Sequence, residues 1–275
     1  MARVVGRVEG TRDVGVARVA ARVSPRLRKR NPRLVKIPAA WATEYVEVRR
    51  EGLRLELDLR DNLQAVLYYA GKYEPGVRRF LRRELRRGDA VLDVGANIGL
   101  HSLTAAQRLR ELGGGRVIAV EPAADSVQKL RRAAERNRLA DLIEVVPVAL
   151  GEQTDEAELR TDSRYDQADA GIRSLHGDGK AVQRVPVIRL DDWAEENALS
   201  RLDVVKLDIE GSEVAALVGA TQTLTRLRPR VVLVEDKRNE ERGRLYDVLG
   251  GLGYAHSGEV YDHNALFRPV GRDAV

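Results

Sequence analysis

The sequence predicts an α/β fold built on a seven-stranded, mostly parallel sheet. From residue 89 onward, short apolar runs typical of buried strands alternate with stretches in which apolar residues recur at helical spacing. Connections of this length between strands favour right-handed parallel crossovers. Hydrophobic residues make up 43% of the 275-residue chain, enough for a sizeable core. We therefore expect one main domain over 89–270, preceded by a smaller N-terminal part.

The first part of the chain, 1–40, is predicted to be a basic and flexible arm. It contains nine arginines and two lysines against Glu9 and Asp13, a balance of +9. Since the whole chain carries +5, the remaining residues carry −4. Such an arm can bind nucleic acid, an acidic membrane surface or an acidic partner, or it can be a solvated leader. No aromatic residue precedes Trp41, so the arm offers no platform for stacking bases.

Residues 41–88 are predicted to form an N-terminal cap of a β-hairpin and a helix. Apolar and polar residues alternate with period two at 45–48 and 53–60, and 50–52 forms the turn between them. The stretch 75–87 has apolar residues at helical spacing on a strongly basic helix that Gly88 closes.

The main domain is then read as an ordered series of strands and helices. Strands are expected at 90–94, 116–120, 143–148, 204–207 and 231–234, and an antiparallel pair at 254–260 and 265–268 finishes the sheet. Helices are expected at about 98–111, from Asp125 or Ser126 as N-cap, from Leu190, from Ser212 to Pro229, and at about 240–250. A polar, glycine-rich insertion over 151–181 has weak strand candidates on either side, at 156–160 and 182–188.

The turn between the first parallel strand and its helix indicates a nucleotide-like ligand. An apolar run leads to Asp93, a turn with Gly95 and Gly99 follows, and a helical pattern begins at once. Helix N-termini and glycine-rich turns of this kind bind ligands in βαβ units. A dinucleotide fingerprint needs a middle glycine where this chain has Asn97, which counts against an NAD-dependent oxidoreductase.

With Glu121 closing the next strand, this pattern resembles motifs I and II of class I S-adenosylmethionine-dependent methyltransferases. The ordered series of motifs resembles the FkbM-type methyltransferase family over about 50–268: Tyr73-Glu74-Pro75, Asp93-Val94-Gly95-Ala96-Asn97-Ile98-Gly99, Val120-Glu121-Pro122, Ala149-Leu150-Gly151, Leu190-Asp191-Asp192 and Lys206-Leu207-Asp208-Ile209-Glu210-Gly211-Ser212-Glu213. The resemblance implies a Rossmann-like fold, S-adenosyl-L-methionine as cofactor and a hydroxyl acceptor on a sugar, glycolipid or secondary metabolite.

The resemblance also implies roles for individual residues. Glu121 is expected to take the ribose hydroxyls, and 149–150 to border the adenine. The implied cofactor-binding residues are Asp93, Gly95, Ala96, Asn97, Gly99, Glu121, Pro122, Ala149 and Leu150. The acceptor is expected at the cap and at the insertion 151–181. In the insertion Arg173 departs from the family's serine-rich turn.

Transfer of a methyl group to a hydroxyl requires that the hydroxyl proton be removed. Lys206, Asp208 and Glu210 are spaced by two, so their side chains point the same way if the strand stays extended. Lys206 can keep one carboxylate ionised, and another can act as base or, with Asp191 or Asp192, hold a divalent cation such as Mg²⁺. The alternative interpretation is a structural network of ion pairs, with Glu213 complementing the dipole of the following helix.

Two histidines are further candidates for the proton acceptor. His101 lies in the first turn after the glycine turn, where the helix N-terminus disfavours imidazolium. His176 lies in the insertion. A packing role for His101 and simple solvation of His176 are the alternatives. The histidines lack the spacing of a zinc site, and the chain has no cysteine, which excludes thiolate ligands and disulfides.

The expected function is therefore an S-adenosylmethionine-dependent O-methyltransferase with a small-molecule or saccharide acceptor. Two alternatives remain open: an RNA or other nucleic-acid methyltransferase that grips phosphates with the basic arm, and a cofactor-binding protein without catalysis. The absence of cysteine suits the cytoplasm. The sequence has neither a signal-like leader nor an apolar run long enough to span a membrane.

Overall fold

The computed structural model describes residues 45–161, 173–236 and 241–271. The predicted basic arm therefore lies outside the described residues. The described chain falls into two compact units, with the division between Tyr73 and Glu74. The hairpin and the helix that follows it belong to the first unit, and everything from Glu74 onward that is discussed below belongs to the second.

The first unit contains the predicted hairpin and a helix that the sequence analysis missed. Strands β1 (Val46–Arg50) and β2 (Leu53–Leu57) pair antiparallel, with Val48 opposite Leu55. Helix α3 (Asn62–Ala70) follows, and the Asp61 carboxylate caps it by accepting the N–H of Gln64. Gly71 ends the helix with φ 71°, a conformation that favours glycine. An Asp cap followed three residues later by Gln was the signal for this helix.

The second unit is built on a seven-stranded sheet with the order β11-β12-β10-β9-β3-β4-β5. Its strands are β3 (Ala90–Val94), β4 (Arg116–Val120), β5 (Ile143–Val146), β9 (Val204–Leu207), β10 (Val231–Glu235), β11 (Tyr254–Tyr261) and β12 (Asn264–Pro269). Neighbours from β5 to β10 pair in parallel, whereas β12 pairs antiparallel with both β10 and β11. This order is that of an open, doubly wound Rossmann-like sheet and confirms the predicted fold class.

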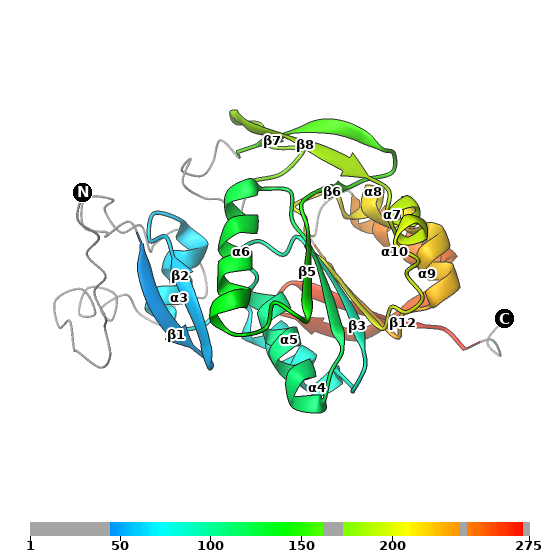
Figure 1. Cartoon of the computed structure of the whole chain (residues 1–275). Helices are drawn as coiled ribbons and strands as arrows, with labels where there is room; N and C mark the ends of the chain where they lie inside the picture. The colour runs from blue at the N-terminus through cyan, green and yellow to red at the C-terminus, as the bar shows by residue number, and fades with distance from the viewer. Residues whose placement is uncertain (1–44, 162–172, 237–240, 272–275) are drawn as a thin grey trace. The chain divides into compact units, whose positions relative to one another are not determined.

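Helices cover both faces of this sheet, so its central strands are almost wholly buried (Figure 1). Helix α5 (Leu100–Leu112) packs on β3, β4 and β5 and against α4 (Pro75–Glu84), while α6 (Ala124–Arg136) packs on β5. The opposite face shares one core with α7 (Leu190–Glu196), α8 (Glu213–Val218), α9 (Thr221–Leu227) and α10 (Glu241–Gly251).

Two predicted boundaries were wrong, and one assumption about a strand end did not hold. Helix α6 begins at Ala124, so Asp125 lies inside its first turn rather than capping it. The helix expected after Ser212 is two helices, because the Gly219 carbonyl accepts the Asp191 N–H and the Thr223 N–H donates to the Asp191 carboxylate instead of continuing one helix. Strand β9 ends at Leu207 as predicted, but the backbone does not stay extended as far as Glu210, which lies in a left-handed turn with φ 56°.

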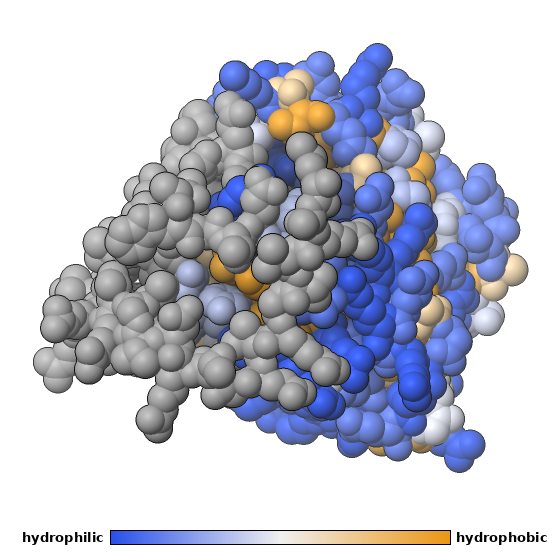
Figure 2. Space-filling model, turned by 60° about the vertical axis from the view of Figure 1, so that its left-hand side comes forward, coloured by the Kyte–Doolittle hydropathy of each residue, from blue (hydrophilic) through white to orange (hydrophobic). Residues whose placement is uncertain are grey.

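The insertion forms a small sheet beside the main one. Strand β8 (Ala181–Ile188) pairs in parallel with β6 (Ala149–Leu150) and antiparallel with β7 (Asp155–Arg160), which confirms the two weak strand candidates. On the face shown in Figure 2, the visible described residues are mainly hydrophilic. Among the described residues, every helix is too short or too polar to cross a bilayer.

Candidate active site at the carboxyl ends of the strands

The turn after β3 is held in an unusual backbone conformation. Gly95, Asn97 and Gly99 all have positive φ angles, of 78°, 50° and 89°. The N–H groups of Gly95 and Ala96 both donate to the Val120 carbonyl oxygen at 3.0 Å, which ties the turn to the end of β4. The loop is thereby fixed before helix α5 begins at Leu100.

Both glycines of this turn are required by contacts within the protein. A Cβ at Gly95 would lie 1.9 Å from the Asp208 carbonyl oxygen, and one at Gly99 would lie 2.7 Å from the Leu130 side chain. Real Cβ atoms do not approach other atoms so closely. The glycines therefore let the turn pack against the end of β9 and against α6, a reason that the sequence pattern did not supply.

Glu121 closes the turn from the end of β4. Its carboxylate accepts the N–H of Asn97 at 2.8 Å and the N–H of Ala123 at 2.9 Å, one on each oxygen. Burial raises the pKa of Glu121 to about 7, although these two N–H donors favour the ionised form. Each carboxylate oxygen has a second lone pair, so the group retains the capacity to accept hydroxyl donors.

A row of charged side chains, Asp93, Lys206 and Asp208, runs from β3 to the end of β9. Asp93 and Lys206 are register partners on these strands, and the Lys206 ammonium lies 3.6 Å from Asp93 and 3.2 Å from Asp208. The second Asp93 oxygen accepts the Ser102 hydroxyl at 2.6 Å. Burial alone would lower the pKa of Lys206, but the carboxylates outweigh it and raise the pKa. Lys206 is therefore a cation that balances the negative charge of this part of the site.

The acidic turn after β9 is only partly as expected. The Glu213 carboxylate accepts the N–H groups of Ile209 and Gly211, so it closes the turn. The backbone is no longer extended at Glu210, but the carboxylates of Asp208 and Glu210 still lie close to each other. With Glu235 at the end of β10, they offer three carboxylate oxygens within 4.8 Å of one another. This is the group of possible cation ligands found among the described residues, and the sequence analysis missed Glu235.

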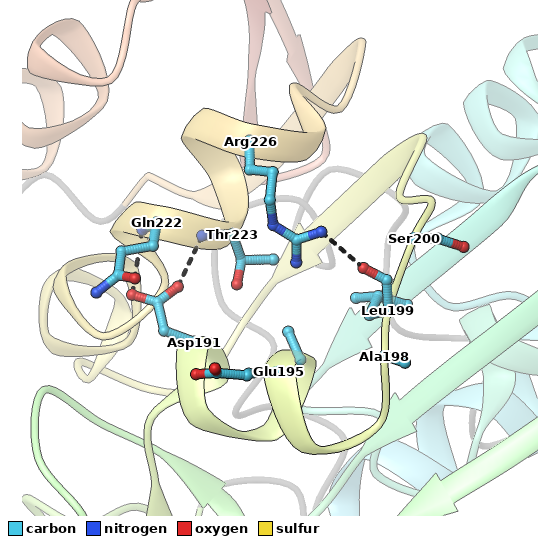
Figure 3. A pocket seen from close by; sticks show the side chains of 9 residues that line it. Asp191, Glu195, Ala198, Leu199, Ser200, Gln222, Thr223 and Arg226 are labelled. Carbon is cyan, nitrogen blue, oxygen red and sulfur yellow. Dashed lines mark hydrogen bonds between the residues drawn. The ribbon is translucent and has the colours of Figure 1, made fainter.

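Asp191, the third expected cation ligand, is not brought to Asp208 and Glu210. Its buried carboxylate accepts the N–H groups of Gln222 and Thr223 at the start of α9, and it pairs with Arg189. These contacts place it beside a pocket of about 430 Å³ between α7 and α9 (Figure 3). The described lining of that pocket includes Glu195 and Arg226 but none of the predicted cofactor residues.

His101 meets a residue to which the sequence analysis gave no role. Its Nε2 lies 3.2 Å from Glu74 Oε2, and both side chains are about one-tenth exposed. Burial, followed by the charges of Lys206 and Arg78, holds the pKa of His101 well below its usual value. Burial and then Asp208 raise the pKa of Glu74 to about 8. The quoted motif Tyr73-Glu74-Pro75 was the signal for Glu74.

The remaining predicted residues lie around this site in different ways. The side chains of Ala149 and Leu150 are buried in the core. The Pro122 carbonyl accepts a hydrogen bond from the Gln183 side chain of β8. His176 is exposed, and its Cδ2 lies 3.9 Å from where a Cβ on Gly211 would be, beside the acidic turn. Arg173 pairs with Asp125 at 2.8 Å, which ties the insertion to α6.

Comparison with known proteins places this arrangement in a family. The family model described as the methyltransferase FkbM domain matches residues 93–266. The chain is 31% identical over 210 residues to 31-O-demethyl-FK506 methyltransferase FkbM of Streptomyces tacrolimicus, covering 64% of this chain and 77% of that protein. It is 26% identical over 151 residues to the hexuronic acid methyltransferase AglP of Haloferax volcanii, covering 55% of this chain and 58% of that protein.

A third relative is much longer than this chain. The AMB antimetabolite synthetase AmbE of Pseudomonas aeruginosa is 30% identical over 207 residues, which cover 62% of this chain but 9% of AmbE. The chain thus spans less than two thirds of the length of two of these three relatives. The family match itself spans more than half of the chain. This protein belongs to the FkbM methyltransferase family.

Proposed function

We propose that this protein is an S-adenosylmethionine-dependent O-methyltransferase that methylates a hydroxyl of a sugar, glycolipid or secondary metabolite. Family membership supports methyl transfer. The names of two relatives support the acceptor class, since one is a hexuronic acid methyltransferase and the other a 31-O-demethyl-FK506 methyltransferase.

The observation that carries the cofactor assignment is the position of Glu121. It ends β4, beside the point where the order of the sheet reverses between β3 and β9, and ligands of doubly wound sheets bind at that point. Backbone N–H groups fix its carboxylate against the turn 95–99 while leaving lone pairs for a ribose. A buried acid with this capacity fits an adenosine-bearing cofactor, which would supply a methyl group activated on a sulfonium.

The acceptor side of the proposed site lies next to this turn. Asp208 lies at the same strand end as Lys206, whose ammonium donates a 3.2 Å hydrogen bond to the Asp208 carboxylate. Ionised carboxylates accept hydrogen bonds from hydroxyl groups and so can orient a polyhydroxylated acceptor. We assign Asp208 and Glu210 this orienting role. His176, beside Gly211, is placed at the same turn and stays a candidate for acceptor contact.

A divalent cation also remains a prediction. The ligand group would be Asp208, Glu210 and Glu235 rather than one that includes Asp191. Asn264 is the register partner of Glu235, so its side chain shares that face of the sheet, and its buried amide has no hydrogen-bond partner among the described residues. Carboxylate and amide oxygens are the ligands that Mg²⁺ and Ca²⁺ accept.

Isothermal titration calorimetry with S-adenosylhomocysteine tests the cofactor assignment. We expect one site per chain, with NADH giving no heat. The acceptor class is tested with methyl-labelled S-adenosylmethionine and a panel of hexuronic acids, other saccharides, macrolides with free hydroxyls, and RNA. Label on a saccharide or macrolide, retained after deletion of 1–40, supports the proposal. Label on RNA that depends on 1–40 would favour the nucleic-acid alternative. A folded protein that binds no S-adenosylhomocysteine would refute the cofactor assignment.

A further inference from the structure

Glu74 and His101 form a buried pair whose two facing atoms have no other partner. Glu74 Oε2 and His101 Nε2 are 3.2 Å apart, and neither has another hydrogen-bond partner among the residues that the structure describes. A carboxylate oxygen and a ring nitrogen form a hydrogen bond only when one of them carries a proton. At 3.2 Å the two atoms are close enough for one proton to be shared between them, carried by Nε2 or by Oε2.

The other nitrogen of the same ring is accessible. The His101 side chain is about one-tenth exposed, and among its ring nitrogens Nε2, not Nδ1, is the fully enclosed atom without a hydrogen-bond partner. His101 is the second residue of α5 and follows the turn at Gly99. Its neighbour Ser102 bonds Asp93, which precedes that turn. A ligand at the turn can therefore reach Nδ1 while Nε2 stays with Glu74.

Two features of α4 hold Glu74 in place. Glu74 precedes Pro75 with φ 40° and ψ 60°, a left-handed conformation that is strained for a residue with a side chain. Asp262, in the turn between β11 and β12, accepts the N–H groups of Gly76 and Val77 and so fixes the start of α4. The position of the carboxylate is thus determined by backbone contacts on either side of Pro75.

The charges that face the pair come from every element around it. Carboxylates of Asp93, Asp208 and Asp262 oppose the ionisation of Glu74, and Lys206 favours it. The cations of Lys206 and Arg78 oppose protonation of His101. Burial is the largest cause of both shifts. It raises the pKa of Glu74 to about 8 and holds the pKa of His101 well below its usual value. Glu74 therefore carries the shared proton at neutral pH. Above about pH 8 the pair releases one proton, and the proton that remains lies on Nε2.

We propose that His101 is the proton acceptor of the methyl transfer and that Glu74 is its positioning partner. This rests on the proposed function. The acceptor's O–H bond breaks and its proton goes to Nδ1, while the oxygen forms a bond to the methyl carbon. The C–S bond breaks with its electron pair left on sulfur, which cancels the sulfonium charge. The Glu74 carboxylate holds Nε2–H and stabilises the imidazolium so formed.

Nitrogen-15 NMR of the histidine rings tests the pair without an acceptor. The chain has four histidines, so His101→Asn identifies the His101 signals by difference. We expect the wild-type ring to change its protonation pattern near pH 8 and to carry its proton on Nε2 above that pH. Glu74→Gln should remove the transition near pH 8 and leave only the titration of the ring itself at lower pH, and Glu111→Gln, at the exposed end of α5, should leave the transition near pH 8 unchanged. A His101 ring that ignores Glu74→Gln would overturn the proposal.

Bound cofactor tests whether the pair lies at the reacting centre. S-adenosylmethionine carries a sulfonium charge that S-adenosylhomocysteine lacks, so it should move the transition to lower pH by more than the product does. Equal effects of the two ligands would overturn the proposal. A wild-type protein that binds neither ligand would instead refute the proposed function.

Kinetics with any acceptor found in the panel complete the test. In single turnovers the wild-type rate should rise with pH and level off above about pH 8. His101→Asn should lower the plateau by about 100-fold or more and remove the pH dependence, as expected for loss of a general base. Glu74→Gln should lower the plateau by roughly 10-fold and move the rise to lower pH, with S-adenosylhomocysteine affinity unchanged. A Glu74→Gln profile that superimposes on the wild type would contradict the assigned roles.

Discussion

The backbone N–H of Asn97 donates a 2.8 Å hydrogen bond to the carboxylate of Glu121, so the turn after β3 and the end of β4 are fixed to each other. Because Ala123 N–H binds the other oxygen, the carboxylate cannot rotate without breaking a hydrogen bond. A ribose that binds there would meet an acceptor already oriented, which lowers the ordering cost of binding.

We predict that Glu121→Gln weakens binding of S-adenosylhomocysteine about 10- to 100-fold, because a hydrogen bond to a charged group contributes roughly 1.5–3 kcal/mol. Hydroxyl donors favour the ionised carboxylate, so wild-type affinity should rise with pH through about 7 and then level off. The variant should lose this dependence. Calorimetry between pH 5.5 and 8.5 measures both effects. Glu144→Gln, a partly exposed position on β5, is the control, and an equal loss of affinity there would contradict the assignment.

Glu121 should also affect stability, with the opposite pH dependence. Its pKa is raised from 4.5 to about 7 in the folded protein, so the folded state binds the proton more tightly than the unfolded state. The stability that this contributes is fully present below pH 4.5 and is lost as pH rises through 7. Glu121→Gln should therefore gain stability relative to the wild type between pH 5 and 8, as measured by urea unfolding. A constant difference across that range would contradict the raised pKa.

Gly95→Ala should be strongly destabilising. The substitution combines a positive φ of 78° with a Cβ 1.9 Å from a backbone oxygen that cannot rotate away. We expect the free energy of unfolding to fall by more than about 3 kcal/mol, a loss typical of severe core or backbone conflicts. Gly250→Ala in α10, where a Cβ meets nothing within 4 Å, is the matched control. It should be neutral or stabilising by up to about 1 kcal/mol. Similar losses in both variants would show that the close approach at Gly95 is not what matters.

The sequence predicted the strands of the main sheet and the turn at 95–99 because these features are local. Apolar runs, helical spacing and glycines at a strand-to-helix turn are readable within ten residues or so. Where a boundary depended on a distant contact, the prediction failed. The break at Gly219 depends on Asp191, which bonds the Gly219 carbonyl and the Thr223 N–H, and the turn at Glu210 depends on Glu213, which accepts N–H groups of the turn.

The candidate site was harder to predict than the fold for the same reason. Lys206 and Asp208 share one strand end and were paired correctly from their spacing. Glu74 precedes helix α4 and lies beside His101, and Glu235 ends β10 and lies near Asp208. Both pairs are far apart in the sequence, so only the folded chain shows these contacts. Asp191 was assigned to the cluster from its residue type, but its carboxylate is engaged at the start of α9.

A buried ion pair lies at the amino ends of the strands, the opposite end from the candidate site. We expect it to contribute to stability alone. Asp89 is fully buried before β3, and its carboxylate contacts Arg230, which precedes β10, at 2.5 Å. Arg230 also pairs with Glu84 and Asp203, so the loss would come from the buried hydrogen bonds that Asp89 accepts from Arg230 and from the Arg86 N–H, which contribute roughly 1.5–3 kcal/mol each. We predict a loss of this order for Asp89→Ala in urea unfolding, with S-adenosylhomocysteine affinity unchanged.

The control for this stability prediction is an exposed pair. Asp141 contacts Arg110, but its side chain is 69% exposed, so Asp141→Ala should change stability by less than about 0.5 kcal/mol. If both variants lost the same stability, burial of the Asp89–Arg230 pair would not explain its effect. A loss of cofactor affinity in folded Asp89→Ala would connect this end of the sheet to the site and contradict a purely structural role.

The predicted cation site can be tested by replacing either of two carboxylates. Asp208, Glu210 and Glu235 place ligand oxygens within 4.8 Å of one another, whereas Asp191 is held by the N–H groups of α9. We expect Mn²⁺ to bind the wild type, measured by electron paramagnetic resonance of the free ion, and Glu235→Gln to weaken binding about 10-fold or more. Asp191→Asn should leave Mn²⁺ affinity unchanged. EDTA should slow methyl transfer, and added Mg²⁺ should restore it. Binding that survives Glu235→Gln but fails in Asp191→Asn would return the site to the position first expected from the sequence.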